Sequence, residues 1–177
     1  MTKVIFASNL TQEDKDVVSN DTIKVLEVIG GLSKNPTLII NSTLRTPLRQ
    51  ANAMYDNEKK GNSIRYAAPG REVIAIYNAN KSKSKEEVVK LMVDKIEELA
   101  KKGQLVSKHC VTKEQYKKKN IVDISQSIPN PRDFVRVAET FKNISKIITP
   151  IEAFKTNPYM TTKVFIDKNE PALHIEL

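Results

Sequence analysis

Apolar residues recur at helical spacing over much of the first part of the chain. The clearest case is residues 84–103, where Ser84 opens a capping-box pattern, apolar residues follow at intervals of three and four, and Gly103 ends the segment. Similar start and stop signals predict further helices over residues 11–31, 46–61 and 130–145. We expect the first of these to break near residues 19–20. We favour a short helix for residues 68–80, whose pattern also fits a strand.

Shorter apolar runs predict strands, most of them in the second part of the chain. Residues 36–43 form a β-branched run too short for a helix. Residues 104–110 and 120–125 resemble strand pieces on either side of a lysine-rich segment that we expect to loop out, and residues 163–167 and 173–177 fit two strands around a turn. The pattern therefore predicts an α+β fold with helices packed on an antiparallel sheet, rather than a repeating βαβ fold.

Composition describes one soluble globular domain, with 40% hydrophobic and 28% charged residues. No repeat or low-complexity linker divides the sequence, so we predict a single domain over residues 1–177, with a helical N-terminal part over 1–36 and a core over 37–177. No apolar run approaches the ~18 residues that a transmembrane helix needs, and the N-terminus lacks the apolar stretch of a signal peptide. We therefore expect synthesis in the cytoplasm and no transmembrane segment.

The net charge narrows the classes of partner. A formal charge of +8 favours an acidic partner, such as nucleic acid, anionic lipid or an anionic wall polymer. The lysines at 81–85 and 117–119 are then either solvated charges or a patch that binds such a polymer. The sequence has no glycine-rich phosphate-binding motif, so we expect no nucleotide cofactor. A single cysteine excludes an internal disulfide.

Candidate metal ligands lie in three of the predicted strands. The two histidines of the chain, His109 and His174, and the aspartate Asp123 match the histidine and carboxylate donors of catalytic zinc. Residues two apart in a strand share a face, so Glu176 is expected to point the same way as His174. Glu170 and Glu176 both lie close enough in sequence to act as general base and acid. Alternatively, the histidines have no shared role and Asp123 forms a structural ion pair.

The order of these segments resembles a known signature. VSKH, VDIS and LHIEL follow one another as a Ser-x-His segment, an aspartate in an apolar strand and a final histidine, and IINSTLRTPLRQANAMY upstream has the shape of a strand ending in Ser-x-x-Arg-Thr. Together they resemble the D-alanyl-D-alanine carboxypeptidase and dipeptidase family of zinc peptidases, whose fold is shared with the Hedgehog signalling domain. The matching segments span residues 37–177, which would form the metallopeptidase-like core.

The resemblance implies a site and an activity. It implies Zn²⁺ held by His109, Asp123 and His174, and peptidoglycan stem peptides as substrates of a carboxypeptidase or endopeptidase. Substrate-facing positions would be Ser42, Arg45 and Ser107, with the Arg45 guanidinium stabilising a carbonyl oxygen or a carboxylate. The family's base lies three residues before the last histidine, where this chain has Pro171, so Glu170 and Glu176 are both kept as candidates.

The resulting prediction is a zinc-dependent peptidase that hydrolyses an amide bond in peptidoglycan peptides by metal-activated water. A phage endolysin released by a holin, or an effector carried by a secretion device, would reach the cell wall without a signal peptide. One alternative is a non-enzymatic basic domain of the same fold that recognises an anionic polymer, and another is an amidase or esterase with the same ligands. A Cys110 nucleophile is disfavoured, because a strand would turn Cys110 away from the face of His109.

Overall fold

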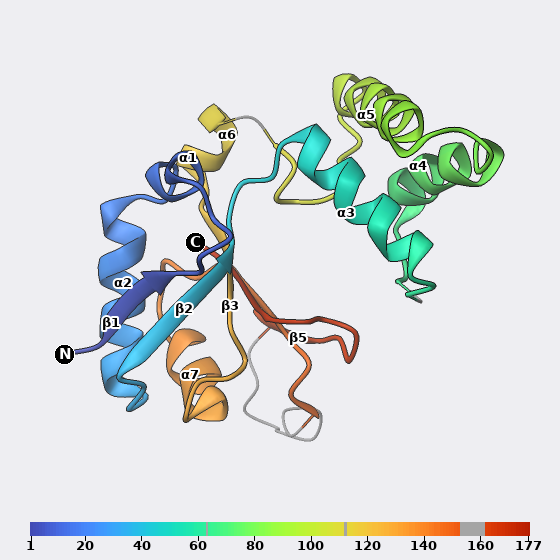
Figure 1. Cartoon of the computed structure of the whole chain (residues 1–177). Coiled ribbons are helices and arrows are strands. Elements are labelled where there is room, and N and C mark those ends of the chain that lie inside the picture. The colour runs from blue at the N-terminus through green and yellow to red at the C-terminus, as the bar shows by residue number, and fades with distance from the viewer. Residues whose placement is uncertain (63, 112, 153–161) are drawn as a thin grey trace. The chain divides into compact units, whose positions relative to one another are not determined.

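The computed structural model describes residues 1–62, 64–111, 113–152 and 162–177. The chain forms two compact units, shown in Figure 1. The sheet unit comprises Met1–Leu44 and Lys113–Leu177, and the helical unit comprises Arg45–Thr112. The helical unit is thus one continuous segment inserted into the sequence of the sheet unit. No described helix is both long and apolar enough to cross a membrane.

The sheet unit is built on six strands in the order β1-β2-β3-β6-β4-β5. The strands are β1 (Lys3–Phe6), β2 (Thr37–Ser42), β3 (Ile121–Ile124), β4 (Lys146–Thr149), β5 (Val164–Ile166) and β6 (Leu173–Glu176). The α+β class is confirmed, but the predicted antiparallel sheet is wrong, because β1–β2 and β4–β5 are parallel pairs. The two strands missing from the sequence prediction, β1 and β4, supply one member of each parallel pair. A connection through helices separates β1 from β2, which is the kind of connection that parallel strands need.

The sheet unit also contains helices. They are α1 (Gln12–Asp16), α2 (Asn20–Leu32), α6 (Lys113–Lys118) and α7 (Pro131–Ala138). The predicted break near residues 19–20 is confirmed, since Ser19 caps α2 by accepting a hydrogen bond from the Thr22 amide. Helix α2 packs against β1, β2 and α7. Val122 of β3 and Ile175 of β6 are register partners and are fully buried on one face of the sheet. The residues next to them in each strand lie on the other face.

The helical unit contains α3 (Pro47–Lys59), α4 (Ala68–Ala79) and α5 (Lys85–Lys101), and α5 packs on both of the others. The helix over residues 68–80 is therefore confirmed. The Ser84 capping box is present, and Gly103 ends the segment with φ of +73°, a conformation that glycine adopts without strain. The core of the unit consists mainly of side chains from these helices, with Met92, Ile96 and Leu99 from α5 almost completely buried.

The predicted strand over residues 104–110 is wrong. The segment forms turns, one of them closed by a 3.0 Å hydrogen bond from the Cys110 amide to the Ser107 carbonyl. Val106 and Cys110 pack against the core of the helical unit instead of joining the sheet. The lysine-rich segment that we expected to loop out contains the short helix α6.

Candidate metal centre

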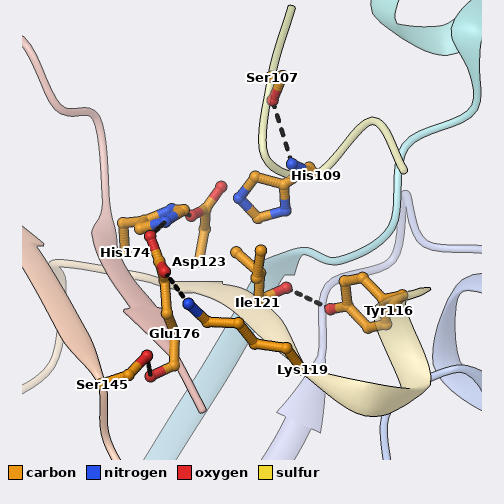
Figure 2. A network of polar contacts seen from close by, with 9 residues as sticks. All are labelled: Ser107, His109, Tyr116, Lys119, Ile121, Asp123, Ser145, His174 and Glu176. Carbon is orange, nitrogen blue, oxygen red and sulfur yellow. Dashed lines mark hydrogen bonds and ion pairs between the residues drawn. The ribbon is translucent and has the colours of Figure 1, made fainter. Parts of the chain in front are cut away.

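Strands β3 and β6 place Asp123 and His174 side by side. The two residues are direct partners in the antiparallel register, so their side chains share one face of the sheet. His174 Nδ1 lies 2.9 Å from Asp123 Oδ1, and the two side chains are 7% and 14% exposed. Figure 2 shows the pair beside Glu176, which lies two residues beyond His174 on the same face.

Glu176 is more deeply buried than Asp123, with a side chain only 2% exposed. Its Oε1 lies 3.6 Å from His174 Nε2, and its Oε2 lies 2.6 Å from Lys119 Nζ. The Lys119 side chain is half-exposed, so its ammonium is partly solvated while it pairs with the buried carboxylate. This ion pair offsets the cost of burying a negative charge.

Lys119 is the residue of this network that sequence reasoning missed. A buried acid in β6 indicates that some cation must accompany it, and the lysine-rich segment supplies several. The sequence does not distinguish among them, because the choice depends on where α6 ends. In the structure Lys118 is exposed, and Lys119 contacts Glu176.

The segment that carries Lys119 is anchored on both sides. Tyr116 is fully buried, and its hydroxyl donates a hydrogen bond to the carbonyl oxygen of Ile121 in β3. Burial raises the pKa of Tyr116, so the hydroxyl stays protonated as a donor. The side-chain amide of Asn120 donates to the Tyr116 carbonyl at 2.8 Å, and the backbone amide of Leu177 donates to the Asn120 carbonyl at 2.8 Å. These bonds fix the backbone from which the Lys119 side chain extends.

His109 belongs to the helical unit, where it is buried at the end of the turn segment. Its amide donates to Ser107 Oγ at 3.3 Å, as Figure 2 shows, and its carbonyl accepts from the Arg45 amide at 2.8 Å. Cys110 beside it is buried in the core of the same unit, and burial raises the pKa of its thiol to about 11, although nearby Arg45 favours the thiolate. A neutral buried thiol is a poor nucleophile, which agrees with the core role expected for Cys110.

The remaining predicted site residues lie in three places. Ser42 ends β2 and is the register partner of Asp123, after an irregularity that follows Ile40. Arg45 begins the helical unit, and its guanidinium donates to Gln50 Oε1 at 3.1 Å. Glu170 lies in the turn before β6, where its carbonyl accepts from Gln126 Nε2 at 3.1 Å. The structure therefore brings Asp123, His174 and Glu176 into direct proximity within the sheet unit.

The donor types decide what this centre can do chemically. His109, Asp123 and His174 offer two imidazoles and one carboxylate, a set of side chains that could hold a metal ion. A carboxylate oxygen and a ring nitrogen repel each other at 2.9 Å unless a proton or a metal ion lies between them. Asp123 Oδ1 and His174 Nδ1 therefore either share a proton in a hydrogen bond or could bind one metal ion together.

No protein-family model, curated protein or solved structure matches the chain.

Proposed function

We propose that this chain is a zinc-dependent peptidase that hydrolyses an amide bond in peptidoglycan stem peptides, with a fold like that of the D-alanyl-D-alanine peptidases. Zn²⁺ would be held by His109, Asp123 and His174. The observation that carries the proposal is the 2.9 Å approach of Asp123 Oδ1 to His174 Nδ1 in a largely buried position. Two metal-type donors that face each other away from bulk water are the core of a zinc site.

Chain connectivity supports the inclusion of His109. Ser42 is paired with Asp123, and Arg45 follows Ser42 by three residues. The Arg45 amide is hydrogen-bonded to the His109 carbonyl. Three residues of extended chain span at most about 11 Å. His109 is therefore hydrogen-bonded to a residue that follows the end of β2 closely in the sequence, and its imidazole completes the set of side chains that could hold a metal ion.

The side chains suggest how the roles are divided. When bound, the zinc ion would polarise the scissile carbonyl and lower the pKa of water. Arg45 would bind a carbonyl oxygen or a carboxylate of the stem peptide through its guanidinium. We assign the general base to Glu170, which would take a proton from water and pass it to the leaving amine. Glu176 is the weaker candidate, because its two oxygens already face His174 and Lys119.

A second candidate function rests on the distribution of charge. The helical unit has fourteen Lys and Arg residues against eight Asp and Glu, so it carries six of the eight net positive charges of the chain. Lys81 and Lys83 are exposed between α4 and α5. Such a unit would attract an anionic polymer with or without catalysis. A non-enzymatic binding domain of the same fold is therefore the alternative.

Metal content tests the proposal first. We would load the purified chain with zinc, remove free metal, and measure bound zinc by elemental analysis in the parent, His174→Ala and His109→Ala, with Lys118→Ala as a surface control. The proposal expects about one zinc per parent chain, a similar content in Lys118→Ala, and little in either histidine variant. A parent chain without zinc after loading would defeat it.

Activity separates the peptidase from the binding domain. The zinc-loaded parent should release new amino groups from peptidoglycan stem peptides, and a chelator should stop this release. Restoration of the activity by added zinc would show that the metal is required. Zinc bound at one per chain, with no hydrolysis of any stem peptide, would support the binding alternative instead.

A further inference from the structure

We infer that Glu176 is a positioning residue that orients His174 toward the metal, and that Lys119 is the ion-pair partner that holds the Glu176 carboxylate in place. This inference rests on the proposed metal site. It assigns a function to the lysine-rich segment between His109 and Asp123, and it removes Glu176 from the candidates for general base.

The backbone of β6 fixes Glu176 in place. Its carbonyl accepts a 2.8 Å hydrogen bond from the Ser145 amide and a 3.2 Å bond from the Ser145 hydroxyl, and it is the register partner of Ile121 in β3. The carboxylate is 2% exposed. A general base must reach the substrate or a water molecule next to it. This carboxylate is enclosed by the protein and points along the sheet toward the histidine.

The contacts of Glu176 select one form of the His174 ring. A carboxylate 3.6 Å from Nε2 favours a proton on that nitrogen, because the N–H then points toward negative charge. With the proton on Nε2, the lone pair of Nδ1 faces Asp123 Oδ1 at 2.9 Å, so a metal ion rather than a proton would lie between these two atoms. That is the tautomer in which Nδ1 can bind a metal. Metal-binding histidines commonly donate their second N–H to a carboxylate, which also fixes the orientation of the ring.

Lys119 makes this arrangement possible. The ammonium lies 2.6 Å from Oε2, which leaves Oε1 directed at His174. The bonds of Tyr116 and Asn120 hold this part of the backbone in position. Among the lysines of the segment whose side chains the structure describes, Lys119 is the one that pairs with Glu176.

Zinc affinity of the full-length chain is the decisive measurement. We would measure it by competition with a chromophoric zinc chelator for the parent, Lys119→Met, Lys119→Arg and Glu176→Gln. Lys118→Met, which changes the exposed neighbour in the same way, is the matched control. Loss of an outer-shell partner typically weakens metal binding 10–100-fold. We expect losses in this range for Lys119→Met and Glu176→Gln, partial rescue in Lys119→Arg, and parent affinity in Lys118→Met.

Kinetics at saturating zinc separate positioning from catalysis. If Glu176 positions His174, Glu176→Gln should keep most of the parent kcat once zinc is in excess. Parent zinc affinity in Glu176→Gln, together with abolished hydrolysis, would show that Glu176 is the base and would overturn the inference. Parent affinity in Lys119→Met would overturn the role of Lys119 while leaving the zinc site intact. Failure of the parent itself to bind zinc would refute the proposed function and this inference with it.

Circular dichroism of the metal-free variants checks that each substitution leaves the chain folded. Glu176→Gln keeps the size of the side chain, and Lys119→Arg keeps the charge, so at least one of them should retain the parent fold. Weaker zinc binding by a variant with the parent spectrum supports the inference, because a purely structural ion pair would not change metal affinity in a folded chain.

Discussion

Cys110 shows how burial of a single residue sets a dependence on pH. Burial raises the pKa of its thiol from 9.0 to about 11, so the folded chain holds the thiol proton more tightly than the unfolded chain does. The associated stability is complete below pH 9 and is lost as the pH rises toward 11, because the unfolded chain releases this proton first. A shift of this size corresponds to about 3 kcal/mol.

We therefore predict that the free energy of unfolding falls between pH 8 and pH 10.5, and that it falls less in Cys110→Ala. Urea denaturation of both proteins at the two pH values measures the difference. The raised pKa of buried Tyr116 acts in the same direction and is common to both chains, so it cancels in the comparison. An equal fall in parent and variant would contradict the burial argument for Cys110.

Individual residues also show how far the sequence could predict the site. The alternation of a strand placed Glu176 on the face of His174, and in the structure the two side chains approach to 3.6 Å. Lys119 could not be found in the same way. Its contact with Glu176 depends on the end of α6 and on the hydrogen bond from Tyr116 to Ile121, and neither leaves a pattern in the sequence.

At the scale of elements, helix α5 offers the sharpest test of local signals. Ser84 Oγ accepts from the Glu87 amide, and the Glu87 carboxylate accepts from the Ser84 amide at 3.0 Å. Replacing an N-cap serine by alanine typically costs about 1 kcal/mol. We predict a loss of this size for Ser84→Ala in chemical denaturation. Ser82→Ala, an exposed change two residues before the cap, should be neutral within about 0.5 kcal/mol. Equal losses in the two variants would show that the cap contributes nothing specific.

The same signals explain which elements could be predicted. Caps and helical spacing gave α2, α3, α4 and α5 close to their observed positions, because both signals are local. Helix α7 ends at Ala138, before the end of the helix predicted over residues 130–145, and β4 begins directly after that range and is a strand because β5 and β6 pair with it. Residues 104–110 show the opposite effect. Their apolar pattern predicts a strand, but Val106 and Cys110 pack against the core of the helical unit.

The two units differ in charge, and the proposed site draws on both of them, with His109 and Arg45 in the helical unit. Asp123, His174, Glu176 and Lys119 all belong to the sheet unit. Most of the net positive charge belongs to the helical unit, which enters the sequence between β2 and α6. If the proposed polymer binding rests on the exposed lysines of the helical unit, substitution of those lysines should alter it without altering the proposed cleavage of a peptide.

We predict that the affinity of the full chain for an anionic wall polymer falls by roughly tenfold or more between 50 and 200 mM NaCl. Binding to a polyanion releases the counterions condensed on it, and added salt makes this release less favourable. Zinc-dependent hydrolysis of a short stem peptide should change much less over the same range, since short-range contacts within a site are weakly screened. Sedimentation with the polymer and release of amino groups measure the two activities on one preparation.

Charge-reversal variants test which of the two units binds the anionic polymer. Lys81→Glu combined with Lys83→Glu, both at exposed positions of the helical unit, should weaken polymer binding and leave hydrolysis of the short peptide unchanged. Lys3→Glu combined with Lys24→Glu alters the net charge equally, but at exposed positions of the sheet unit. Because both double variants carry the same net charge, equal weakening would show that only total charge matters. Weakening confined to the first would assign polymer binding to the helical unit.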